Sequence, residues 1–317
     1  MKNKFNVKAI IMFAAAVALA FAGVYSPILL YLCPVFLAAT FAYSGIVFFV
    51  LAIGMLFSGV IYLTDITSAL YIMLTVLPSA IALSCLFKGR CSYRTAVIAC
   101  VVAIAISLYV TTFVPYLLEG KTAVYAIDDK VTGIVEAFRS SLSLYETMPE
   151  YEALAASADE MSKMIFSMSE ELVFATITIQ ALCYGFLQVI AGYLMLGKSL
   201  ALKKMAHFKD WQIPKSYLWG SLMILGASII LSETGVSYAG AFSVVAGLII
   251  VAPFALVGVA TMEFFVQITP EGKGFRRVLT YGMALLCFPF SIFMLAIEGI
   301  ADRLFSLRKR IIVIKKP

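Results

Sequence analysis

Long apolar stretches, separated by short polar loops, make up nearly all of this chain. A helix that crosses a bilayer core needs about 20 apolar residues, and these continuous runs differ from the alternating segments of about ten residues that build membrane barrels. The pattern therefore predicts an all-α, polytopic transmembrane bundle of about eight or nine segments. They lie near residues 7–24, 28–43, 45–63, 66–87, 95–118, 172–196, 217–233, 238–266 and 278–297.

One stretch, residues 119–171, breaks this pattern. It holds 11 of the 18 acidic residues against four basic ones, Lys121, Lys130, Arg139 and Lys163, so its net charge is −7 and that of the remaining chain is +13. Apolar residues recur there at helical spacing in two groups on either side of Pro149, which predicts two amphipathic helices outside the membrane. The groups are Ile127, Val131, Ile134, Phe138 and Leu142, then Leu154, Met161, Met164, Ile165 and Met168.

Composition agrees with a membrane protein and excludes several other classes. Hydrophobic residues make up 62% and charged residues 13% of the chain, and its mean hydropathy is +1.00, whereas about 25% of the residues of a soluble domain are charged. The basic residues are divided among short loops, which fits membrane orientation better than nucleic-acid binding. The six cysteines show no CxxC spacing and His207 is the only histidine, so we expect no metal, no cofactor and no enzyme site.

The basic loops predict the orientation, because Lys and Arg are enriched in cytoplasmic loops. A cytoplasmic N-terminus places the loops 88–94 and 198–215 inside after four and six crossings, and the acidic insert outside. This divides the chain into a six-helix module over 1–197, a basic loop over 198–216 and C-terminal segments over 217–317. Three further crossings would place the basic residues 308–310 outside. If 238–266 instead turns back at Pro253, then Lys273, Arg276 and Arg277 would lie outside. One basic cluster is thus misplaced in both cases, unless the last segment, which contains Pro289, does not cross.

Polar residues inside apolar segments are candidate binding groups, because they are costly at membrane depth. Gln180, Tyr184 and Gln188 lie four residues apart on one side of the sixth segment. Two interpretations stay open for them, a ligand pocket and helix–helix hydrogen bonding. Asp65 and Glu233 lie at the predicted outer ends of their helices, where they are ordinary interfacial residues or bind a cationic ligand that enters from outside. Glu263 lies deeper and is a candidate ion or proton site.

Small residues recur every four positions in the first segment. Ala14, Ala18 and Ala22 would let a second membrane helix approach closely. This face is therefore a candidate docking surface for a membrane partner. The alternative is that the helix is simply rich in alanine.

The chain resembles the YybS family of predicted bacterial membrane proteins, whose function is unknown. Three places along the chain carry the resemblance. The first is the Ala-rich first segment followed by Pro27, Pro34 and Gly45, and the second is Trp211-x-x-Pro214 with Trp219. The third is the closing run 298–309, which contains Gly299, Asp302, Arg308 and Lys309. The resemblance implies a multi-pass protein of the bacterial plasma membrane.

That family is similar in turn to the substrate-binding S components of energy-coupling factor transporters. The similarity implies that the first six segments bind a small molecule or vitamin, that the alanine face docks a transmembrane coupling subunit, and that a separate ATPase drives uptake. Two alternatives stay open. One is an envelope interaction or assembly protein that acts through the acidic insert, and the other is an ion-coupled carrier that uses Glu263.

Overall fold

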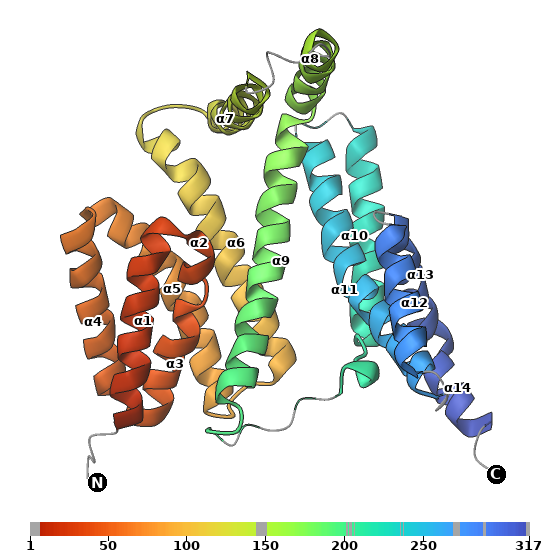
Figure 1. Cartoon of the computed structure of the whole chain (residues 1–317), viewed down its shortest axis with the longest axis horizontal. Coiled ribbons are helices and arrows are strands. Elements are labelled where there is room, and N and C mark those ends of the chain that lie inside the picture. Colours follow the sequence, from red (N-terminus) through yellow and green to blue (C-terminus); the bar gives the residue numbers. More distant parts are fainter. Residues whose placement is uncertain are drawn as a thin grey trace. The chain divides into compact units, whose positions relative to one another are not determined.

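The chain folds entirely into helices and loops in its computed structural model, which describes residues 7–314 apart from 144–150, 201, 203–204, 206, 235, 237, 269–272 and 288–289 (Figure 1). This confirms the predicted all-α class. The α-helices are α1 Val7–Tyr25, α2 Pro27–Leu30, α3 Cys33–Ser44, α4 Ile46–Leu63, α5 Ile66–Phe87, α6 Tyr93–Leu118, α7 Ala123–Ser143, α8 Tyr151–Ser167, α9 Ser169–Leu196, α10 Lys215–Glu233, α11 Ala239–Ile268, α12 Lys273–Leu286, α13 Phe290–Phe305 and α14 Leu307–Ile314, with a 3₁₀ turn η1 at Phe208–Asp210.

Seven of the described helices are long and apolar enough to cross a membrane, namely α1, α4, α5, α6, α9, α10 and α11. A shorter apolar stretch, Ile28–Ser44, covers α2 and α3. The many crossing helices place this chain in the lipid bilayer as a multi-pass protein.

The helices form two compact units. Unit 1 comprises residues 1–162 and 176–205, and unit 2 comprises residues 163–175 and 206–317. Unit 1 therefore contains α1 to α7, most of α8 and the larger part of α9, whereas unit 2 contains α10 to α14.

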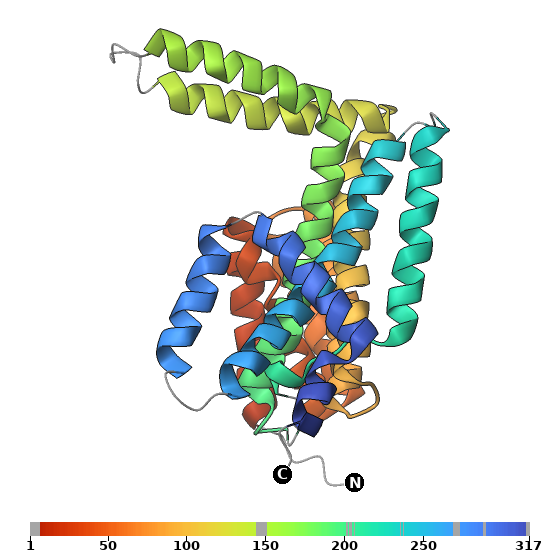
Figure 2. The same cartoon turned by 90° about the vertical axis from the view of Figure 1, so that its right-hand side faces the viewer.

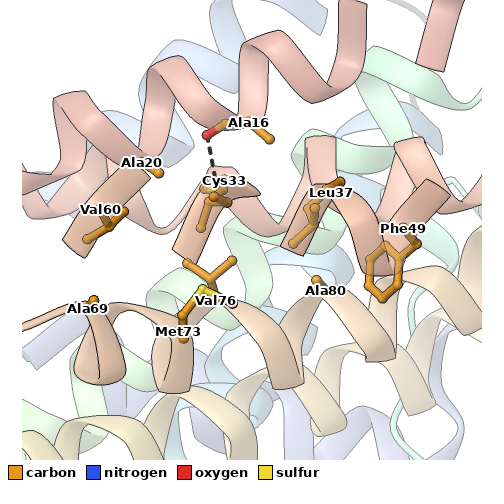
Figure 3. Packing of buried hydrophobic residues seen from close by; sticks show 12 residues of the cluster. Ala16, Ala20, Cys33, Leu37, Phe49, Val60, Ala69, Met73, Val76 and Ala80 are labelled. Atoms are coloured by element: carbon orange, nitrogen blue, oxygen red, sulfur yellow. Dashed lines mark hydrogen bonds between the residues drawn. The ribbon is translucent and has the colours of Figure 1, made fainter. Parts of the chain in front are cut away.

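The core of unit 1 lies where small residues of α1 meet α3 and α4. Ala16 and Ala20 are fully buried there and bring the backbone of α1 close to α3 (Figure 3). The thiol of Cys33 donates a hydrogen bond to the carbonyl of Ala16 over 3.3 Å. Cys33 therefore satisfies its weak donor inside the core, as expected of a small residue in an apolar helix.

The acidic insert forms a helical hairpin of α7 and α8, which lie side by side (Figure 2). Ile127 and Val131 are buried on α7, and Arg139 of α7 pairs with Asp159 of α8 at 2.8 Å. The prediction of two amphipathic helices is thus confirmed, while Pro149 lies outside the described residues. At the corner before α7, the Tyr116 hydroxyl donates to the Asp129 carboxylate over 2.6 Å.

In unit 2, α10 and α11 run antiparallel. The Tyr217 hydroxyl donates to the Ile249 carbonyl, and Ser243 donates to the Ser228 carbonyl. Helix α11 is continuous through Pro253. The hypothesis that 238–266 turns back at this proline is therefore wrong.

The predicted segment 278–297 is two helices rather than one. Helix α12 ends at Leu286 and α13 begins at Phe290. Their 14 and 16 residues correspond to about 21 Å and 24 Å, both less than the thickness of about 30 Å of a bilayer core. Helix α12 runs away from the end of α11 and α13 returns toward the same end (Figures 1 and 2). This supports the alternative in which the last segment does not cross, although Pro289 itself lies outside the described residues.

Candidate functional site

A break in an apolar helix exposes a backbone carbonyl inside unit 1. Pro34 lies in the first turn of α3, lacks an N–H group, and its ring would clash with the carbonyl four residues earlier, so the helix cannot continue from α2. The Val35 N–H, which in a continuous helix would bond to Tyr31, instead bonds to the Leu32 carbonyl over 3.1 Å. The carbonyl of Tyr31 is thereby left for another donor.

Gln188 of α9 supplies that donor. Its Nε2 donates to the Tyr31 carbonyl over 2.9 Å, and its side chain is fully buried. Its second polar atom, Oε1, is also buried and has no hydrogen-bond partner in the described part of the chain. A buried amide oxygen without a donor is costly, so this atom is a candidate acceptor for a bound molecule.

Two tyrosine rings stack beside this amide. The centroids of Tyr31 and Tyr184 are 3.9 Å apart and their planes differ by 13°. Tyr31 is buried and Tyr184 is half-buried, and both pack against Ile104 and Ala181. The site thus combines a planar aromatic surface with an unpaired acceptor.

Gly185 brings α6 close to this site. A Cβ atom at Gly185 would lie 2.6 Å from Val101 Cγ2 and 2.7 Å from its backbone nitrogen. Since no real side chain tolerates such distances, only glycine permits α9 to lie this close to α6. We call Tyr31, Tyr184 and Gln188 the tyrosine–glutamine site.

The structure brings some of the predicted polar residues together and leaves others elsewhere. Tyr184 and Gln188 share the tyrosine–glutamine site, and Gln180 is half-buried further along α9. Asp65 is exposed and caps α5, where it accepts hydrogen bonds from the backbone N–H and hydroxyl of Ser68 at 2.8 Å and 2.6 Å. These donors hold the pKa of Asp65 below its usual value. Glu233 is the exposed last residue of α10 in unit 2.

Glu263 lies near the end of α11 within a dense set of donors. Its carboxylate accepts hydrogen bonds from Gln267 at 2.6 Å and Tyr281 at 2.9 Å, and it pairs with the guanidinium of Arg277. The carboxylate is 9% exposed and the Arg277 side chain is 48% exposed. These contacts tie α12 to α11 and support a structural role for Glu263, while proton or ion transfer by this residue stays a prediction.

The alanine face of α1 is open. Ala14 and Ala18 are exposed and Ala22 is half-buried, whereas Ala16 and Ala20 point into the core. The two sets lie on different sides of one helix, so the first segment packs inward with one row of alanines and presents another row outward.

A buried ion pair connects two of the sequence motifs within unit 2. The Arg308 side chain donates through Nε and Nη2 to Asp302 at 3.0 Å and 2.7 Å, and both residues are 3% exposed. Arg308 also donates to the carbonyls of Lys209 and Trp211, the latter over 2.8 Å. The closing run and the Trp211-x-x-Pro214 motif therefore meet through one guanidinium group, and we call this set the C-terminal clamp.

No sequence pattern pairs Tyr31 with Gln188 or Arg308 with Trp211. Tyr31 and Gln188 are 157 positions apart, and Arg308 is 97 positions from Trp211. The available signal was Pro34, because a proline inside a long apolar run marks a place where a carbonyl loses its donor. Within the described ranges, no group of three His, Cys, Asp or Glu side chains is arranged to hold a metal ion.

Comparison with known proteins assigns the chain to a family but identifies no individual relative. No curated protein matches the chain, and no solved structure matches it. A family model described as predicted membrane protein (DUF2232) matches residues 14–303, which is nearly the whole chain. The chain therefore belongs to the DUF2232 family of predicted membrane proteins.

Proposed function

We propose that the protein is a non-enzymatic membrane subunit that binds a small molecule through the tyrosine–glutamine site. The observation that carries this proposal is the buried Oε1 of Gln188, an acceptor without a donor beside a stacked aromatic pair. A polar atom at this depth is retained at a cost in stability. Supplying its missing hydrogen bond is what a ligand would do.

The chemistry of the site narrows the ligand class. Gln188 Oε1 accepts, so the ligand carries an N–H or O–H donor. Tyr184 is half-buried and one of its faces is already stacked on Tyr31, so a planar ring can stack on its other face. The ligand class is thus a small planar molecule with a hydrogen-bond donor, which is compatible with a vitamin-like compound.

The outward alanine face supports a partner of the kind found for S components. Exposed Ala14 and Ala18 would allow a helix of a transmembrane coupling subunit to approach α1 closely. The chain lacks a GxxxxGK[ST] phosphate-binding motif, so a separate ATPase would supply the energy for uptake. The similarity to the YybS family and to S components agrees with this arrangement.

Purification of the full chain from native membranes, followed by mass spectrometry, tests both parts of the proposal. We expect wild-type protein to retain a small molecule that Gln188→Leu loses. Ser79→Ala, which alters another buried polar group of unit 1, serves as the matched control and keeps the ligand. We expect Ala18→Leu to lose a copurifying coupling subunit that Val47→Leu, at an exposed site of α4, retains. Identical small molecules in wild type and Gln188→Leu would contradict the binding proposal.

A further inference from the structure

The second helix of the acidic insert carries an uncovered apolar face. Leu154, Met161 and Met164 of α8, with Met168 in the turn after it, are 41%, 44%, 63% and 41% exposed. Their spacing places them on one side of a helix. We call these four residues the methionine stripe.

Helix α7 covers only part of the apolar surface of α8. Ala158 and Ser162 are the buried residues of α8, and the pair Arg139–Asp159 joins the two helices at 2.8 Å. At 100° per residue, Ala158 and Ser162 point to a side of α8 next to the methionine stripe. The apolar arc of α8 is therefore wider than the side that α7 occupies, and the stripe stays open beside it.

The acidic residues around the methionine stripe indicate which kind of partner could bind there. The insert has 11 acidic and four basic residues, a net charge of −7, and Asp128, Glu136 and Glu160 are exposed on the hairpin. A membrane surface with anionic lipids is repelled by such a charge, and a second copy of the insert would bring two like charges together. A helix with one apolar and one basic face would cover the apolar stripe and also pair with the surrounding acidic residues.

We propose that the methionine stripe is a docking site for a basic amphipathic helix of a partner protein. Methionine side chains are unbranched and polarizable, so they adapt to the apolar face of a helix laid against them. The surrounding carboxylates attract the Lys and Arg residues of that helix and accelerate the encounter. This interaction is independent of the tyrosine–glutamine site.

The test uses the full chain in nanodiscs of zwitterionic lipid, titrated with a fluorescent Leu/Lys amphipathic peptide of about 18 residues. Binding to empty nanodiscs is subtracted. We expect saturable binding that the double variant Met161→Ser/Met164→Ser weakens at least about tenfold. Met195→Ser, at an exposed methionine of α9 outside the insert, should leave the affinity unchanged.

A second pair of measurements separates this proposal from simple charge attraction. Glu136→Gln/Glu160→Gln should weaken binding at low salt and have less effect at high salt. A peptide of the same composition with a scrambled, non-amphipathic order should bind at least about tenfold more weakly. Equal binding of the scrambled peptide, or unchanged affinity of the serine variant, overturns the proposal. So does a serine variant that instead changes the protein's binding to anionic vesicles or its self-association.

Discussion

A single proline creates the polar centre of unit 1. Pro34 removes the N–H that would continue the helix, the Val35 N–H shifts its bond to Leu32, and the carbonyl of Tyr31 is left to the amide of Gln188. A membrane interior supplies no water to satisfy such a carbonyl. The long-range bond from Gln188 is therefore a requirement of the break, and the unpaired Oε1 is its consequence.

Asp65 should make stability depend on pH at the start of α5. Its folded pKa is lowered by the Ser68 donors, so the carboxylate stabilises the fold above its unfolded pKa, and this contribution is lost as pH falls through the folded pKa. We expect Asp65→Ala to lower the melting temperature at pH 7 and to differ little from wild type at strongly acidic pH. Asp65→Asn, which keeps a capping oxygen, is the control and should remove the pH dependence while retaining most of the neutral stability.

The C-terminal clamp should be sensitive to the loss of one partner. Arg308→Met would leave the carboxylate of Asp302 buried without its cation, which typically costs about 3–5 kcal/mol. We expect a clear drop in the unfolding temperature measured by intrinsic fluorescence, with partial recovery in Arg308→Met/Asp302→Leu. The exposed neighbour Arg310 provides the control, and equal melting of Arg308→Met and Arg310→Met would show that the clamp is dispensable.

At the scale of elements, two glycines decide how closely α11 and α13 cross. A Cβ at Gly258 would lie 1.9 Å from the Leu295 carbonyl oxygen, and one at Gly299 would lie 2.1 Å from that of Phe254. Both obstacles are backbone atoms, so the helices must separate to admit a methyl group.

We therefore expect Gly258→Ala and Gly299→Ala each to destabilise unit 2 by about 1–3 kcal/mol or more, as overpacking does. Gly247→Ala on the same α11 meets nothing within 4 Å and should be neutral or slightly stabilising, because alanine favours a helix. Thermal unfolding of the three variants in one detergent measures the difference. Similar melting temperatures of all three variants would mean that α11 and α13 can move apart without a loss of stability.

The elements were predictable where hydrophobicity alone decides them. Continuous apolar runs gave α1, α4, α5, α6 and α9 to α11, and helical spacing gave the insert hairpin. The break between α12 and α13 was not settled by the pattern, because an apolar run of this length fits either one crossing helix or two short ones. The site was only half predictable: periodicity grouped Tyr184 with Gln188, but Tyr31 depends on a contact between distant segments.

At the scale of the molecule, the arrangement of unit 2 bears on the conflict between the predicted number of crossings and the positive-inside rule. Arg308 bonds to the carbonyls of Lys209 and Trp211 just before α10 begins, so it lies at that end of α10. Arg277 pairs with Glu263 near the end of α11, and α11 runs antiparallel to α10. Since α12 leaves this end and α13 returns to it, the basic residues Lys209, Arg277 and Arg308 all lie at one end of unit 2. The positive-inside rule therefore predicts that this end faces the cytoplasm.

Cysteine labelling measures this arrangement directly. In a background without the six native cysteines, we expect Glu233→Cys to react with an impermeant maleimide in spheroplasts, because it ends α10 at the opposite end. His207→Cys and Lys309→Cys, both at exposed positions, should react only after the membrane is permeabilised. If Lys309→Cys reacted together with Glu233→Cys, α13 would have to cross the bilayer and leave a basic tail outside. Protection of Lys309→Cys would instead mean that α12 and α13, whose 14 and 16 residues are too few to span, enter the membrane and return to the same side. The basic clusters of the chain, from its first loop to its last helix, would then all follow the positive-inside rule.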